Sequence, residues 1–172
     1  MWIPQPGLTV SASKADRPRF WLVFLLDNLP EGSIFKVGAL HITVIPWFVA
    51  DLSSQEIIET FYTKFSTFQQ LEIKVGKLIE LGPRNVPVSL IEPSPELLAI
   101  HQEALAWFKD IEARWALKDP YVDDQFLPHI RRRGGASLLE GETIKFKSLS
   151  LVSARRQEDG LRKVAARVGS GG

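Results

Sequence analysis

The sequence of 172 residues contains no cysteine, and this absence removes several kinds of chemistry at once. Disulfide bonds, catalysis by a thiolate and zinc sites built on cysteine are all excluded. A chain without cysteine fits the reducing cytoplasm, and we expect the protein to be cytoplasmic.

Long hydrophobic runs are also missing. No stretch approaches the about 20 apolar residues that a membrane-spanning helix needs, and the segment Met1–Pro6 lacks the basic start and apolar core of a signal peptide. Charge of one sign is not in excess either, because the formal net charge is +1. Any binding of an anion must therefore be local. With 45% hydrophobic residues the chain can form one globular domain, which we expect to be a soluble monomer.

Histidine is scarce, yet two of the three histidines lie in matching surroundings. His41 belongs to the apolar run Leu-His-Ile-Thr-Val-Ile, and His129 belongs to the run Leu-Pro-His-Ile-Arg. Residues two apart in an extended strand point to the same face. Thr43 should therefore project beside His41, and Arg131 beside His129, while the isoleucines point into packing.

Apolar spacing and turn residues predict two helices and seven strands. One helix should follow Ser53, which begins a capping-box pattern, and the other should follow Ser94, which precedes a proline. In the second helix, His101 falls on the apolar face, so we expect it to be a hydrogen-bonded packing residue. Strands are expected at about 20–26, 39–49 with a bend or end at Pro46, 71–81, 86–91, 127–131, 143–152 and 161–168.

This order of elements predicts an α+β fold of two mixed lobes with antiparallel sheets and helices on the outside. Each lobe contributes one histidine strand, and the two strands are expected to face each other across a central cleft. We assign 1–19 to an N-terminal arm, 20–168 to a single bilobal domain and 169–172 to a flexible tail.

Two convergent imidazoles suit a displacement at a phosphodiester, since one can take a proton while the other gives one. A hydroxyl at Thr43 and a guanidinium at Arg131 are the groups that hold phosphoryl oxygens. The sequence offers further candidates for substrate binding. Three aromatic residues and one arginine make up this group: Trp47, Tyr121, Phe126 and Arg133.

The segments around the two histidines resemble the motifs of a known family. The segment His-Ile-Thr-Val from His41 resembles the first H-x-T-x motif of the two-histidine phosphoesterases, which include bacterial RNA 2′,3′-cyclic phosphodiesterases, also called 2′-5′ RNA ligases. The segment Phe126–Ile130 resembles the lead into the second motif. The resemblance covers about residues 20–168 and implies a bilobal fold and no metal. It also implies opening of a 2′,3′-cyclic phosphate or cleavage of a 2′-5′ linkage, with His41 and His129 as the acid–base pair and Thr43 as a phosphate ligand.

One position departs from the family pattern, since Arg131 stands where the second motif has threonine or serine. Arginine can bind phosphate through two N–H groups, but it also disfavours a protonated imidazole nearby. One alternative is therefore an RNA- or nucleotide-binding module with weakened or lost catalysis. Another is a structural domain in which the histidines only pack. The substrate stays open between RNA 3′ ends, oligonucleotides and small cyclic nucleotides.

Overall fold

A computed structural model of the chain describes residues 17–36, 39–118, 121–132, 138–155 and 160–170. Within them lie ten strands, two α-helices and one short 3-10 helix, η1. Every strand pair is antiparallel, which confirms the predicted α+β class. In chain order the elements are β1 (Arg19–Leu25), β2 (Ile34–Lys36), β3 (His41–Val49), α1 (Ser54–Phe65), β4 (Leu71–Leu81), β5 (Val86–Ile91), α2 (Pro95–Asp110), β6 (Arg114–Trp115), η1 (Asp123–Gln125), β7 (His129–Arg131), β8 (Thr143–Phe146), β9 (Ser148–Ala154) and β10 (Leu161–Gly169).

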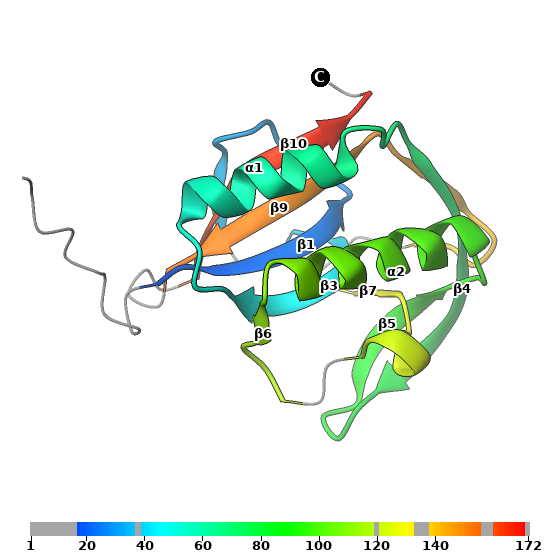
Figure 1. The fold of residues 1–172 in the computed structure, drawn as a ribbon. Coiled ribbons are helices and arrows are strands. Elements are labelled where there is room, and N and C mark those ends of the chain that lie inside the picture. Colours follow the sequence, from blue (N-terminus) through cyan, green and yellow to red (C-terminus); the bar gives the residue numbers. More distant parts are fainter. Residues whose placement is uncertain (1–16, 37–38, 119–120, 133–137, 156–159, 171–172) are drawn as a thin grey trace, which may run out of the picture.

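The strands form one curled sheet in the order β2-β10-β9-β1-β3-β7-β5-β4-β8, with β6 paired to β3. The strands from β2 to β3 make up one half, and those from β7 to β8 make up the other. Both helices lie on the same face of the sheet (Figure 1). Helix α1 contacts β10 and helix α2 contacts β3, so each helix covers the sheet near a different part of the strand order.

Both helices begin where their capping residues predict. The Ser53 side chain accepts a hydrogen bond from the Glu56 amide while the Glu56 carboxylate accepts one from the Ser53 amide, which completes the capping box. At the second helix, the Ser94 hydroxyl accepts from the amide of Leu97 and Pro95 occupies the first turn. These local signals act within a few residues, which is why the sequence located them.

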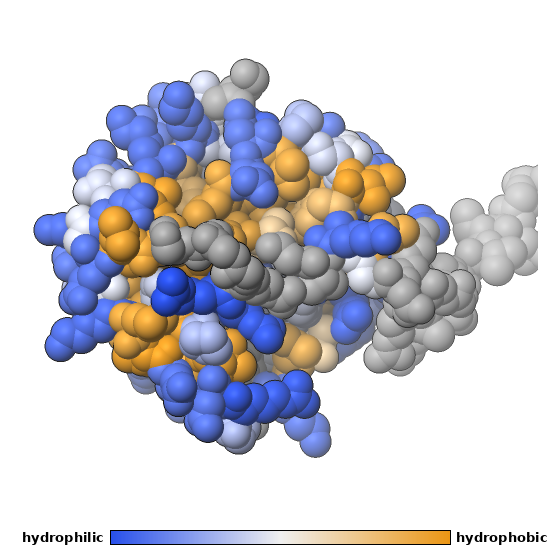
Figure 2. Space-filling model, turned by 180° about the vertical axis from the view of Figure 1, so that it is seen from behind, coloured by the Kyte–Doolittle hydropathy of each residue, from blue (hydrophilic) through white to orange (hydrophobic). Residues whose placement is uncertain are grey.

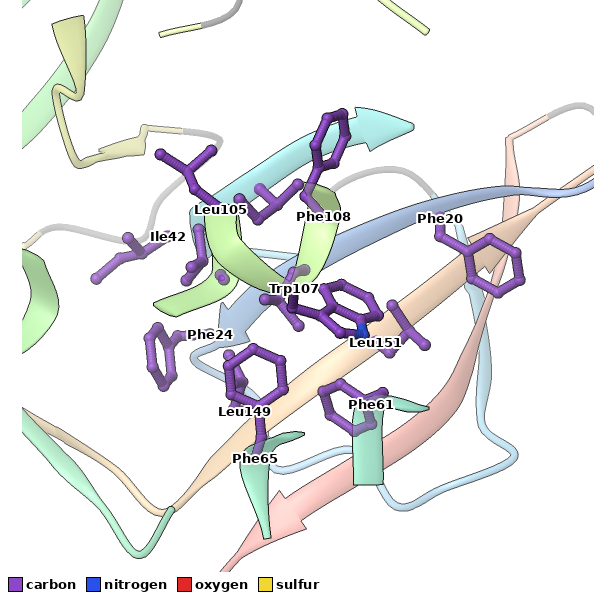
Figure 3. Packing of buried hydrophobic residues seen from close by; sticks show 14 of the residues in the cluster. Phe20, Phe24, Ile42, Phe61, Phe65, Leu105, Trp107, Phe108, Leu149 and Leu151 are labelled. Carbon is purple, nitrogen blue, oxygen red and sulfur yellow. The ribbon is translucent and has the colours of Figure 1, made fainter. Parts of the chain in front are cut away.

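The main core lies between the helices and the sheet, and Trp107 of α2 stands at its centre. The Trp107 ring makes an edge-on contact with Phe48 of β3. It makes the same kind of contact with Phe61 and Phe65 of α1 (Figure 3). Its indole nitrogen donates to the Thr60 hydroxyl at 3.0 Å, so its one polar group is satisfied on α1. This core holds the helix-facing side of the sheet in a fixed position.

A second, smaller core occupies the opposite face of the sheet. Its five buried residues come from β1, β9 and β10: Trp21, Val23, Leu25, Val152 and Val164. Because β1 is buried on both faces, its sequence is a continuous apolar run without alternation. The direction of each β1 side chain was therefore not readable from the sequence.

The placement of the two histidine strands differs from the prediction. We expected β3 and β7 to face each other across a cleft, but they are neighbours in the sheet and pair at Ile42 and Ile130. The halves of the molecule thus join through these strands. The difference arises because hydrogen bonding between β3 and β7 satisfies both strand edges and continues one sheet through the molecule.

Several element boundaries also differ from the prediction. Strand β3 continues through Pro46, because register shifts against β1 absorb extra β3 residues there. The expected strand 143–152 is two strands, since β8 pairs with β4 and β9 pairs with β1. The short strands β2 and β6 were not predicted. Residues 1–16 of the proposed arm and 171–172 of the proposed tail lie outside the described residues, and Arg19 already belongs to β1.

Gly169, assigned above to the tail, is the last residue of β10 and pairs with Ser148. Its φ is 136°, and a Cβ atom there would lie 2.0 Å from the carbonyl oxygen of Lys147. Only glycine accepts both the backbone angle and the close approach. We therefore expect Gly169→Ala to lower the free energy of unfolding by roughly 1–3 kcal/mol, measured by urea denaturation.

The matched control for this change is Gly141→Ala. Gly141 also has a positive φ, of 87°, but nothing lies within 4 Å of the position that a Cβ atom would take there, so only the backbone strain is tested. If the two variants lose equal stability, the close approach to Lys147 contributes nothing.

Candidate active site

The pairing of β3 with β7 puts both histidines on the face of the sheet away from the helices. Ile42 and Ile130 are paired in register and fully buried in the helix-side core. Successive residues of a strand alternate between faces, so His41 and His129 project to the other side. Both imidazoles are half-buried there.

The same register assigns each histidine a cross-strand neighbour. With Ile42 opposite Ile130, antiparallel pairing sets His41 opposite Arg131 and Thr43 opposite His129. The two histidines are then diagonal neighbours, for which Cα atoms are typically ~7–8 Å apart. This spacing leaves room for one tetrahedral phosphate between the imidazoles. All four side chains that the two motifs contribute therefore share one face.

A local twofold axis through the Ile42–Ile130 pair describes this arrangement. Rotation about it carries His41 onto His129 and Thr43 onto Arg131. It also carries β1, the outer neighbour of β3, onto β5, the outer neighbour of β7. The axis thus relates two identical side chains, the imidazoles, but it relates the Thr43 hydroxyl to the different Arg131 guanidinium.

Both imidazoles are oriented by the same hydrogen bond. His41 Nδ1 lies 2.8 Å from the carbonyl oxygen of Ala39, and His129 Nδ1 lies 2.7 Å from the carbonyl oxygen of Leu127. A carbonyl oxygen only accepts, so Nδ1 carries the hydrogen in both rings. Nε2 is then the nitrogen without a hydrogen in the neutral form of each ring, which is the atom that an acid–base role would use.

Trp21 of β1 positions the first motif. Its indole nitrogen donates to the Thr43 hydroxyl oxygen at 3.2 Å, and its ring meets the His41 ring edge-on with centroids 4.2 Å apart. An indole N–H only donates, so the Thr43 oxygen accepts here and its own hydrogen can be directed elsewhere. Trp47 stacks on Trp21 with centroids 5.0 Å apart and extends this aromatic group away from His41.

A pocket of about 310 Å³ opens beside His129 and Thr43. Its wall includes the predicted aromatic residues Tyr121 and Phe126, and Tyr121 meets the His129 ring edge-on at 6.4 Å. The full lining is Thr43, Pro46, Leu117, Lys118, Tyr121, Phe126, Leu127 and His129. Among these described residues no side chain is acidic and Lys118 is basic, so the pocket suits an anionic ligand.

His101 braces this pocket from behind. The ring is fully buried, its Nδ1 lies 2.9 Å from the carbonyl oxygen of Val44, and its Nε2 accepts from the amide of Asp123 at 2.9 Å. It also stacks in parallel on Phe126, with centroids 3.7 Å apart. The prediction of a hydrogen-bonded packing residue is confirmed. One face of Phe126 is consequently covered by His101, so only its other side can contact a ligand.

The predicted candidates fall into three groups. The register brings His41, Thr43, His129 and Arg131 to one face, and the pocket adds Tyr121 and Phe126. Trp47 lies instead on the Trp21 side, outside the pocket wall. Arg133 lies outside the described residues.

Sequence reasoning missed Trp21, Lys118 and Arg162, each for a physical reason. Trp21 lies within the unbroken apolar run of β1, where alternation gives no direction. Lys118 follows β6, a two-residue strand too short to detect. Arg162 lies far along the chain and reaches the site only because β10, β9 and β1 are adjacent in the sheet.

Figure 2 shows this face of the molecule, where hydrophobic and strongly hydrophilic residues adjoin one another. In the described part of the chain, no group of three or more histidine, aspartate or glutamate side chains is placed to hold a metal ion. Likewise, no helix in the described ranges is long and apolar enough to cross a membrane.

The curled, mostly antiparallel sheet with two helices matches the fold of the LigT-like two-histidine phosphoesterases. The resemblance noted in the sequence motifs is therefore confirmed at the level of the fold.

Comparison with known proteins supports this fold directly. No family model and no curated protein matches the chain in sequence. Escherichia coli LigT complexed with phosphate matches in structure with a TM-score of 0.57 and 10% identity, over 90% of this chain and 99% of LigT. TT0787 of Thermus thermophilus matches with a TM-score of 0.58 and 16% identity, over 90% and 98%. A structure described as a phosphoesterase matches with a TM-score of 0.50 and 12% identity, over 78% and 87%. LigT has also been solved with 3′-AMP, and that structure has a TM-score of 0.55 and 11% identity to this chain.

The environment of His101 predicts a pH-dependent stability. Burial lowers the pKa of His101, while the Val44 carbonyl and the charge of Asp123 partly oppose this shift. The unfolded chain then binds more protons than the folded chain below the ordinary histidine value of about 6.5. The contribution of His101 to stability is complete above that pH and is lost as the pH falls.

We test this with His101→Gln, which does not titrate but keeps a donor and an acceptor. The free energy of unfolding should fall more steeply for the wild type than for the variant between pH 6.5 and pH 5. All other groups are the same in both proteins, so their contributions cancel in the difference. Parallel curves would contradict the prediction, because they would show that the pKa of His101 is the same in the folded and the unfolded chain.

Proposed function

We propose that this protein is a metal-independent phosphodiesterase that opens 2′,3′-cyclic phosphates at RNA ends or cleaves related cyclic or 2′-5′ nucleotides. The observation that carries the proposal is the pair of imidazoles on one face, each with Nδ1 hydrogen-bonded to a backbone carbonyl oxygen two residues earlier. The fold shared with LigT and the family motifs around His41 and His129 support it.

In this mechanism a phosphate binds between the imidazoles. One histidine takes a proton from water through Nε2 as the water oxygen forms a bond to phosphorus. The bond from phosphorus to one ribose oxygen breaks, and the other histidine, protonated at Nε2, donates a proton to that oxygen. The product is a ribose phosphate monoester. The local twofold axis makes either assignment of acid and base geometrically possible, so the substrate's orientation decides the roles.

Thr43 and Arg131 stabilise the charge that builds on the phosphoryl oxygens. Because Trp21 donates to the Thr43 oxygen, the Thr43 hydroxyl hydrogen is available to a phosphoryl oxygen. Arg131 is exposed and lies opposite His41, from where its guanidinium can reach the same phosphate. Trp21 is a positioning residue, since it acts on substrate only through Thr43 and His41.

The direct test is a short RNA that ends in a 2′,3′-cyclic phosphate, incubated with the protein in the presence of a metal chelator. The wild type should convert it to a single phosphate-monoester isomer. His41→Ala and His129→Ala should each lower kcat by ~10²–10⁴-fold, the usual contribution of a positioned acid or base. Product formation is followed by chromatography.

Glu103→Ala is the control, because Glu103 lies on the exposed side of α2, and α2 covers the face of the sheet opposite to the histidine pair. It should keep the wild-type rate. An unchanged rate in either histidine variant would remove that imidazole from the mechanism. If the wild type leaves the RNA intact from pH 5 to pH 9, hydrolysis of cyclic RNA ends is the wrong function.

The second candidate is an RNA- or nucleotide-binding module with weakened catalysis, and the position of Arg131 favours it. The register sets Arg131 of β7 opposite His41 of β3. Arg131 is also two residues after His129 in the same strand, so it is a neighbour of both histidines. This arginine puts a fixed positive charge where the family's second motif has a neutral hydroxyl, so the groups around the reacting phosphate differ from the family pattern. The same charge strengthens binding of a phosphate.

The substitution Arg131→Thr separates the two candidates, because it restores the hydroxyl that the family has at this position. If Arg131 serves as a phosphate ligand in catalysis, the variant should lose about tenfold or more in kcat/KM on cyclic-ended RNA. If Arg131 has converted an enzyme into a binder, kcat should rise while the affinity for the RNA falls. Kinetics and fluorescence anisotropy on the same RNA distinguish these results.

A further inference from the structure

A cluster of two tryptophans and two arginines extends the candidate active site on the side of His41. Arg162 Cζ lies 5.0 Å from the ring centre of Trp21 and 5.0 Å from that of Trp47. Arg19 Cζ lies 5.7 Å from the ring centre of Trp47. We call Trp21, Trp47, Arg162 and Arg19 the tryptophan–arginine cluster.

The cluster adjoins the histidine pair through Trp21. The Trp21 ring contacts both the His41 ring and the Arg162 guanidinium, so one indole connects the imidazole with the cluster. Arg162 points to this face because Val164, two residues along β10, belongs to the small core on the same side. None of the four residues lines the pocket beside His129.

The chemistry of the cluster is that of a phosphate site. A guanidinium held over an aromatic face keeps its N–H groups at the edge of its plane, where they can bind phosphate oxygens in pairs. Contact with two indole rings also restricts the side chain, which lowers the entropy lost on binding. Trp47 is half-buried, so part of its surface can contact a ligand that approaches Arg162.

We infer that the tryptophan–arginine cluster binds the phosphate and base of the nucleotide next to the one that reacts. This inference rests on the proposed function, since it names the substrate class of the same site. A terminal nucleoside would occupy the pocket beside His129, the reacting phosphate would lie between the histidines, and the next phosphate of the strand would bind Arg162. The preferred substrate is then an oligonucleotide of at least two nucleotides and not a cyclic mononucleotide.

The test compares two substrates with the same reactive end, a nucleoside 2′,3′-cyclic phosphate and a trinucleotide that ends in the same cyclic phosphate. The wild type should prefer the trinucleotide in kcat/KM. In Arg162→Gln the ratio of the two kcat/KM values should fall about tenfold, as expected for one lost charge-assisted phosphate contact. The slope of log kcat/KM against log salt for the trinucleotide should weaken by about 0.7.

Two further variants make the result specific. Lys163→Gln removes a positive charge from the adjacent residue of β10, which is exposed and in register with Ser153, and should leave the substrate ratio unchanged. Arg162→Lys keeps the charge but loses the planar guanidinium with its paired N–H groups, so it should retain most of the salt slope and part of the preference. Thermal melting of each variant identifies any loss that comes from unfolding.

The inference is overturned if Arg162→Gln lowers both substrates equally, if Lys163→Gln has the same effect, or if the wild type shows no preference for the trinucleotide.

The inference about the cluster and the proposed function can fail separately. If the wild type turns over neither substrate, the phosphodiesterase proposal fails, and fluorescence anisotropy with a labelled trinucleotide then tests whether the cluster binds RNA. Equal affinities of the wild type and Arg162→Gln would exclude the site, and a weaker affinity with a lower salt slope only in Arg162→Gln would support it.

Discussion

The pairing of Ile42 with Ile130 is the contact on which the candidate site depends. It joins the two halves of the molecule in one sheet, and both isoleucines are fully buried against the helices. Because strand side chains alternate, burial of these two residues forces His41 and His129 to the opposite face. A shift of one residue in either strand would turn that strand's histidine into the core. The hydrophobic energy of the helix-side core thus fixes the geometry of the polar site.

The two imidazoles are held by equivalent hydrogen bonds, but different residues surround each of them. Each Nδ1 is tied to the carbonyl two residues earlier, whereas Trp21 supports the His41 side and the loop held by His101 supports the His129 side. The aromatic cluster with Arg162 and the pocket with Tyr121 also lie on different sides. This asymmetry gives a polar, directional substrate one preferred way to bind across a nearly symmetric pair.

The shared fold is evidence for the architecture, whereas the departure from the family pattern concerns the chemistry. Structural likeness at 10% and 16% identity shows a common architecture with LigT and TT0787 and leaves the chemistry to the residues themselves. Arg131 is the departure that separates the two proposed functions, since it puts a phosphate-binding guanidinium where the family's second motif has a hydroxyl. The proposed enzyme and the proposed binder therefore have the same fold and differ in the effect of one side chain.

The sequence by itself determined the features that depend on near neighbours along the chain. The helix starts at Ser53 and Ser94, the alternation of His41 with Thr43, and the packing role of His101 follow from spacings of two to four residues. Only the tertiary structure decided that β3 and β7 are adjacent, that Trp21 contacts Thr43, and that Arg162 reaches the same face. These contacts join residues far apart in the chain, and they are set by the strand order of the sheet, which local residue patterns do not encode.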